Sequence, residues 1–181
     1  MENKLDVELF EFGNESRLKV AAQVQNIENK IILRATISGD LSNIDFPIVS
    51  QTPRRMHGLW EIGVFEIFVS GKGSAYTEYN FGFNRHYEIF SFLDYRQHQT
   101  PPPSIDNPPK ITVETKDGAF TLHVELSEDI VSDNLFSIAA AIKLKNGSVL
   151  YFANAHCGDK ADFHLERART LRMPRKILYK Q

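Results

Sequence analysis

The chain has 181 residues, of which 42% are hydrophobic and 24% charged, with a formal net charge of -2 and a pI near 6.3. This composition is typical of one globular domain, excludes a disordered chain, and gives no overall attraction to nucleic acid or an anionic membrane. The single cysteine, Cys157, excludes an internal disulfide framework, and the polar opening residues lack the apolar segment of a signal peptide. We therefore expect a cytoplasmic protein with no nucleic-acid or membrane partner.

Alternating apolar and polar residues indicate strands along most of the chain. In chain order the expected strands are 6–12, 17–27, 30–38, 59–69, 75–83, 87–93, 110–116, 119–126, 135–144 and 148–156. Short Asn, Asp and Gly segments between several of them favour hairpins. One short helical stretch is expected at 127–133, with Ser127 as its N-cap. The sequence predicts an all-β fold: a single-domain antiparallel β-sandwich, jelly-roll-like, of about ten strands over residues 1–181.

Two long connections interrupt the strands. Residues 39–57 form the first, and the proline-rich segment 100–109 forms the second. A proline-rich segment is also a typical ligand of domains with an aromatic groove. Long ordered loops usually cover the surface of their own domain, so we expect these to form a lid over the sandwich.

The sequence lacks the common motifs of catalytic and metal sites. SGKGS does not complete a phosphate-binding loop, and there is no nucleophile elbow, H-E-x-x-H helix or pair of C-x-x-C motifs. The loop HCGDKADFH holds His156, Cys157, Asp159, Asp162 and His164, but their spacing matches no standard zinc framework. We expect a protein that is not an enzyme and has no metal ligands.

An acidic residue lies within the most apolar predicted strand. Strand alternation places Trp60 and Glu66 on one face, and Glu78 and Asn80 share a face of the next strand. If the register sets these faces side by side, an aromatic ring is flanked by hydrogen-bonding groups, and Arg96 is within reach of the carboxylates. A sugar ring requires this combination, because it has an apolar C–H face and a rim of hydroxyl groups.

The same residues carry a family resemblance. LWEIGVFEIFV, YTEYNFGFNRHYEIFSFLDYR and YFANAH...DFH...LRMP resemble the bacterial DOMON-like proteins, which are related to the family 9 carbohydrate-binding modules. The pattern is LW, a glutamate six residues after the Trp, and then Y-x-E-[FY]-N-[FV]; it is matched by Trp60, Glu66, Tyr76, Glu78 and Asn80. The resemblance covers roughly residues 55 to 175. It implies a jelly-roll-like β-sandwich whose relatives bind sugars or, in some DOMON branches, haem.

Carried over residue by residue, the resemblance makes Trp60 a stacking wall, Glu66 an acceptor for a sugar hydroxyl and Arg96 the basic sugar contact. Sugar-binding relatives clamp the ring between two tryptophans, whereas this chain has one Trp in total. The resemblance therefore implies that the second wall comes from the loop between Asn154 and Phe163, where Phe163 is the available aromatic residue. Asn154 and His156 in this loop complete the expected ligand-binding set.

Other interpretations of the same residues stay open. Trp60 is a core residue in one of them, with Glu66 held by Arg96 or by the backbone, which would leave a structural or protein-interaction sandwich with a vestigial site. Haem binding requires axial ligands, for which the candidates are the residues Met56, His57, His156 and Met173. Calcium is implied only by family analogy, and no ligands are assigned to it.

The C-terminal segment ERARTLRMPRKILYK is strongly basic. It is either a footprint for RNA or an acidic partner, or an edge strand protected by charge, and we favour the second. The sequence predicts a non-catalytic, carbohydrate-binding-like module, with a haem-binding domain as the alternative. It names no sugar and no oligomeric state.

Overall fold

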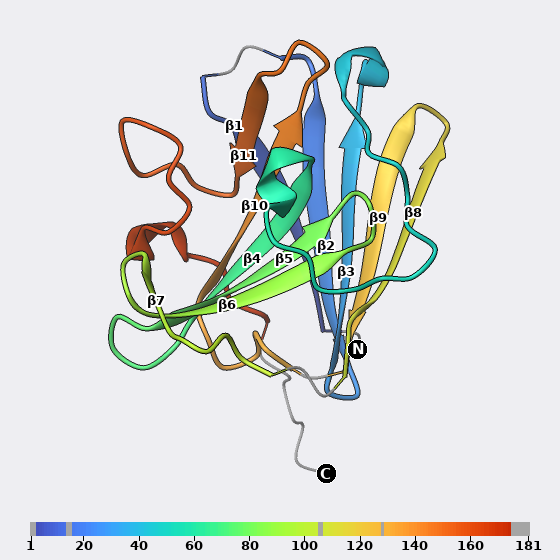
Figure 1. Ribbon diagram of the computed structural model, residues 1–181. Helices are drawn as coiled ribbons and strands as arrows, with labels where there is room; N and C mark the ends of the chain where they lie inside the picture. Colours follow the sequence, from blue (N-terminus) through green and yellow to red (C-terminus); the bar gives the residue numbers. More distant parts are fainter. Residues whose placement is uncertain (1–2, 14–15, 105–106, 128, 175–181) are drawn as a thin grey trace.

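The computed structural model describes residues 3–13, 16–104, 107–127 and 129–174 (Figure 1). The strands are β1 (Asn3–Glu11), β2 (Lys19–Ile27), β3 (Lys30–Ser38), β4 (Val64–Ser70), β5 (Tyr76–Gly82), β6 (Tyr87–Asp94), β7 (Gln97–His98), β8 (Lys110–Lys116), β9 (Ala119–Leu126), β10 (Phe136–Lys143) and β11 (Val149–Ala153). Single 3-10 turns occur at η1 (Leu41–Asn43), η2 (Leu59–Glu61) and η3 (Glu166–Ala168). The predicted all-β antiparallel fold is confirmed. In the described part of the chain no helix is long and apolar enough to cross a membrane.

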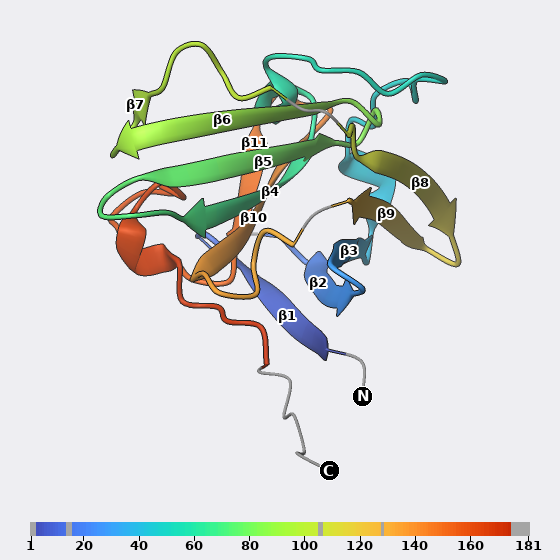
Figure 2. The same ribbon diagram turned by 90° about the horizontal axis from the view of Figure 1, so that it is seen from below.

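The strands form two layers that cross at an angle (Figures 1 and 2). One layer has the order β8-β9-β3-β2-β1, and the other has the order β7-β6-β5-β4-β10-β11. Strand β1 belongs to both layers, because it pairs with β2 along most of its length and with β11 at Phe10 and Glu11. The described strands therefore form one continuous series of hydrogen-bonded neighbours through both layers. Strand β11 is not an edge strand, because it pairs with β10 on one side and with β1 on the other.

The main core lies between the two layers. Strand alternation sends Ile31, Leu33 and Ile37 of β3 inward from one layer, and Phe65 and Ile67 of β4 inward from the other; all five are fully buried. Burial of such large apolar side chains supplies most of the stability of a sandwich. Because this core is complete in itself, the opposite face of β4 and its neighbours is available for a binding site.

The beginning of the predicted strand 59–69 is wrong. Strand β4 starts at Val64, whereas Leu59–Glu61 form the turn η2 and Gly63 has a φ of 112°. A Cβ atom at Gly63 would lie 2.5 Å from the ring of Phe83, so a close approach to that ring and the left-handed backbone both require glycine here. Trp60 therefore lies on a turn before the strand and does not share the alternation of Glu66.

The helix predicted at 127–133 is also wrong, since the described residues of this segment form turns. The Asp129 carboxylate accepts the backbone N–H groups of Val131 and Ser132 at 3.2 and 3.0 Å. The amide of Asn26 on β2 donates to the same carboxylate. These bonds satisfy the N–H groups locally without a helix, a competition that is typical of Asp.

The long connections are anchored on the sheets. In the first, Phe46 packs 4.9 Å from the ring of Phe120 and closes one end of the core. At its end, Arg55 binds Glu88 of β6 and donates to the Pro103 carbonyl of the second connection at 2.8 Å. The Arg55 guanidinium thus fixes both connections to β6. Positions 105–106 of the second connection lie outside the described residues.

Candidate functional site

The outer face of the second layer carries acidic residues at its centre. Strand pairing sets Glu66 of β4 opposite Asn80 of β5 on one side and opposite Ala139 of β10 on the other. Glu78 of β5 lies opposite Phe68 of β4, so Glu66 and Glu78 are diagonal neighbours on one face.

A cavity of about 600 Å³ covers this face. Its aromatic lining consists of Phe12, Trp60, Phe90, Phe92, Tyr151 and Phe163. Its polar lining consists of Glu66, Glu78, Arg96, Lys160 and the imidazoles of His57, His98 and His164. The volume is that of a small-molecule site, and aromatic walls around a few polar groups are typical of one.

The aromatic residues flank the acidic pair from two directions. Trp60 is 37% exposed, and its ring centroid lies 4.9 Å from that of His57 and 6.4 Å from that of Phe90 on β6. On the β11 side, the rings of Tyr151 and Phe163 lie 6.0 Å apart. The acids on β4 and β5 therefore lie between an aromatic group at β6 and another at β11.

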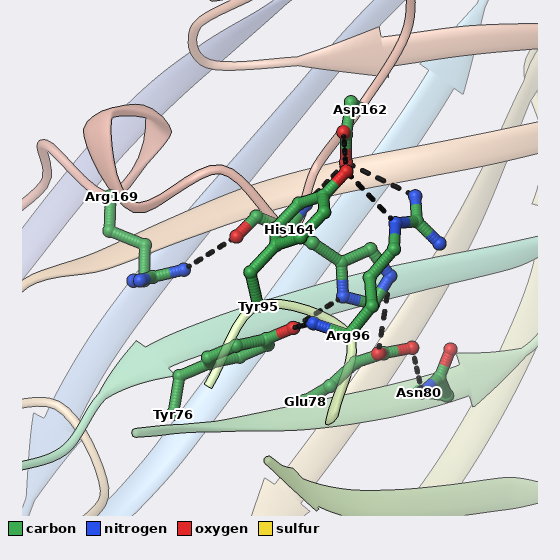
Figure 3. A network of polar contacts seen from close by, with 8 residues as sticks. All are labelled: Tyr76, Glu78, Asn80, Tyr95, Arg96, Asp162, His164 and Arg169. Atoms are coloured by element: carbon green, nitrogen blue, oxygen red, sulfur yellow. Dashed lines mark hydrogen bonds and ion pairs between the residues drawn. The ribbon is translucent and has the colours of Figure 1, made fainter. Parts of the chain in front are cut away.

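A polar network holds Glu78 in place (Figure 3). Asn80 Nδ2 donates to Glu78 Oε1 at 2.7 Å, and His164 Nε2 lies 3.8 Å from Glu78 Oε2. The Nδ1 atom of the same imidazole is 2.8 Å from the Tyr76 hydroxyl, which also accepts the backbone N–H of Arg96 at 3.1 Å. In the tautomer in which the Tyr76 hydroxyl donates to Nδ1, the imidazole N–H is on Nε2, toward Glu78.

Arg96 pairs with Asp162 and not with Glu66, which corrects the pairing considered from the sequence. Its Nη2 atom lies 3.1 Å from Asp162 Oδ1, and the Tyr95 hydroxyl donates to Asp162 Oδ2 at 2.5 Å. Arg96 follows β6 with a φ of 54°, and its half-exposed side chain meets the loop that contains Asp162. Within the described residues, the Glu66 carboxyl group forms no hydrogen bond and no ion pair.

Burial governs the protonation of the site. It raises the pKa of Glu66 well above the ordinary value of 4.5, and the charge of Glu78 raises it further, while Arg96 opposes both effects. Burial also raises the pKa of Glu78 to about 7, against the hydrogen bond from Asn80. The pKa of His164 falls to about 4, chiefly because of burial, so this imidazole is neutral near neutral pH. The acidic pair retains a proton there and offers both a donor and an acceptor.

Of the residues expected to bind a ligand, Trp60, Glu66, Glu78 and Arg96 line the cavity. Asn80 is fully buried behind Glu78. Asn154 accepts the backbone N–H of Ile138 at 2.8 Å and joins β11 to β10. Neither amide lines the cavity, so their part in ligand binding stays a prediction.

His156 lies behind the aromatic lining. Its Nε2 atom is 2.7 Å from the Phe10 carbonyl oxygen, and its ring packs edge-on against Phe12 at 5.3 Å. The imidazole thus supports Phe12, which lines the cavity.

Sequence reasoning missed Arg169 as a structural residue. It is buried, with 4% of its surface exposed. Its Nε donates to Ser70 Oγ at 3.0 Å, and its Nη1 donates to the His164 carbonyl at 3.2 Å. Its guanidinium also lies 4.7 Å from the centroid of the Tyr76 ring. Up to position 174 the segment is not an edge strand, because Leu171 makes only an isolated bridge with Phe136. Residues 175–181 of the basic tail lie outside the described residues. No periodicity in the sequence distinguishes Arg169 from its exposed basic neighbours.

The candidate haem ligands do not form a pair in the cavity. Met173 is in the main core between the layers, and Met56 Sδ accepts from Asn84 Nδ2 at 3.6 Å. His57 lines the cavity without either methionine. A methionine–histidine pair therefore does not fit this site. Across the described residues, no group of three or more His, Cys, Asp or Glu side chains is arranged to hold a metal ion.

No known family model matches this sequence, and no curated protein is significantly similar to it. The fold is similar to the crystal structure of a provisionally assigned carbohydrate-binding protein from Bacteroides uniformis ATCC 8492, with a TM-score of 0.68 and 10% identity over 95% of this chain and 86% of that one. This similarity establishes a shared fold.

Two structures of a family 9 carbohydrate-binding module from Caldicellulosiruptor kristjanssonii are more distant. The complex with glucose has a TM-score of 0.47 and 9% identity over 81% of this chain and 73% of that one. The complex with cellotriose has a TM-score of 0.46 and 8% identity over 84% and 71%. Membership of the DOMON-like proteins stays a prediction.

Proposed function

We propose that this protein binds a carbohydrate in the cavity over β4 and β5 and does not act on it chemically. One observation carries the proposal: aromatic side chains on two sides of the cavity flank a pair of buried carboxyl groups. An aromatic face matches the C–H face of a sugar, while a donor and an acceptor side by side match its hydroxyl groups.

The fold supports the same proposal. The Bacteroides uniformis protein that shares this fold is provisionally assigned as carbohydrate-binding. Similarity of fold does not transfer a ligand, so the weight rests on the cavity.

Trp60 offers a direct assay, because it is the single Trp of the chain and lines the cavity. Titration of the protein with neutral monosaccharides and oligosaccharides should change the Trp fluorescence with at least one of them. The Trp60→Ala variant, assayed by calorimetry, should bind that sugar between about twofold and tenfold more weakly, the worth of one stacking contact.

The matched control is Ile48→Ala, which removes an apolar side chain that is 96% exposed and outside the cavity lining. Its affinity should equal that of the parent. If no sugar binds, or if Trp60→Ala binds as tightly as the parent, the proposal is wrong.

A further inference from the structure

Glu66 is a buried acid without a counter-ion. It is 5% exposed and lines the cavity, and it forms no hydrogen bond or ion pair with any described residue. Its diagonal neighbour Glu78 is also 5% exposed. Two adjacent buried carboxylates are costly unless a positive charge or a proton neutralises them.

The cations nearby are engaged elsewhere or lie at the rim. Arg96 forms its ion pair with Asp162 at 3.1 Å. Arg169 donates to the His164 carbonyl on the far side of the network. Lys160 is exposed at the rim of the cavity. The floor of the cavity thus holds two acids that form no ion pair with a lysine or arginine of the described residues, although the charge of Arg96 acts on both.

The aromatic lining favours a cation at the same place. Trp60, Phe90 and Tyr151 line the cavity together with both acids. The faces of such rings attract an organic cation as well as the C–H face of a sugar, and this attraction grows when water is excluded. A ligand that has both a sugar ring and a positive charge would satisfy the walls and the floor at once.

We propose that the preferred ligand is an amino sugar, whose protonated amine is held by Glu66 and Glu78 while its ring stacks on the aromatic lining. This inference rests on the proposed function, because it assigns a charge to the ligand of the same cavity. A neutral sugar fits the walls and offers hydroxyl groups to the acids, but it brings no positive charge to them.

Proton release provides a second signature of the amine. The titratable and charged groups around Glu66 in the cavity are Glu78, His57, His98, Arg96, Lys160 and His164. The raised pKa values of Glu66 and Glu78 mean that the empty site retains a proton near neutral pH. A bound ammonium group stabilises the ionised acids, so this proton leaves to the buffer. A neutral sugar displaces no charge and releases no proton by this route.

The experiment compares matched sugars by calorimetry at low salt and near neutral pH. Glucose, galactose and mannose are each titrated alongside their 2-amino and 2-acetamido derivatives, in two buffers with different heats of ionisation. At least one 2-amino sugar should bind about tenfold more tightly than both of its uncharged counterparts, the scale of one charge-assisted contact. Its binding should release protons.

Glu66→Gln should reduce this preference to less than about threefold and reduce the proton release, because the shape is kept and the charge is removed while Glu78 still titrates. Glu114→Gln removes the same charge from an exposed position on β8 and should leave the preference unchanged. Melting temperatures of both variants verify that they are folded.

Three outcomes separate the two proposals. Equal or tighter binding of the uncharged sugars by the parent overturns the amino-sugar inference and leaves carbohydrate binding intact. A preference for the amine that persists in Glu66→Gln also overturns the inference, because the charge would then act elsewhere. If no sugar of any kind binds, both the inference and the proposed function are wrong.

Discussion

Substitution of Glu78 by Gln should make the protein less sensitive to pH. The carboxyl group is 5% exposed, and its pKa rises from the ordinary 4.5 to about 7 in the folded state. A carboxyl group with a raised folded-state pKa contributes its full stability below pH 4.5 and loses it as the pH rises to about 7, because only the unfolded chain ionises freely in that interval.

The size of the effect follows from that interval. At about 1.36 kcal/mol for each unit of pKa, the folded parent should lose about 3 kcal/mol relative to Glu78→Gln between these limits. Glu66 and His164 titrate in both proteins, so most of their contribution cancels in the difference. The charge of Glu78 also raises the pKa of Glu66, which enlarges the difference in the same direction.

The measurement is urea unfolding of the parent and of Glu78→Gln at several pH values from 4.5 to 8, since 4.5 is the ordinary pKa of this group. Glu114→Gln serves as the control for an exposed carboxylate and should follow the parent. A stability difference between the parent and Glu78→Gln that does not change with pH would refute the burial argument. So would a difference that grows in favour of the parent as the pH rises.

Two further predictions test the scaffold of the site. Gly63→Ala should lower the free energy of unfolding by about 1 to 3 kcal/mol, because a φ of 112° strains any other residue and the new Cβ would meet Phe83. Thermal melts measure this loss, and an unchanged melting temperature contradicts it. Asn154→Ala should cost about 1 to 3 kcal/mol by leaving the Ile138 N–H unpaired, while the affinity of a bound sugar stays within about twofold of the parent. A larger loss of affinity would show that Asn154 contributes to ligand binding.

Strand positions were predictable because their signal is local. The expected strand 30–38 agrees with β3 at both ends, and β8 and β9 agree with 110–116 and 119–126. Their alternation and turn residues lie within a few positions of each other. Gly63 shows the limit of this local signal. The residue pattern of LWEIG is the same for an extended strand as for a turn, so it did not indicate that β4 begins only at Val64.

The partners of the site residues were not predictable, because they are distant in sequence. Arg96 meets Asp162 across 66 positions, and Tyr76 meets His164 across 88. The loop that supplies Asp162 and His164 has no periodicity. The sequence therefore indicated which acids share a face, but not that Arg96 would pair with Asp162 instead of with these acids.

The arrangement of the acids explains why the proposed binding face can coexist with a stable sandwich. The inward side chains of β4, such as Phe65 and Ile67, complete the core, so the outward side of the same strand is free of that task. Asn80 holds Glu78 while the carboxyl group of Glu66 meets no described partner, which leaves one fixed acid and one available acid. Desolvation makes both carboxyl groups unfavourable as anions in the empty protein, and the same desolvation strengthens any ligand contact that neutralises them. Folding and the proposed binding thus depend on opposite faces of one strand.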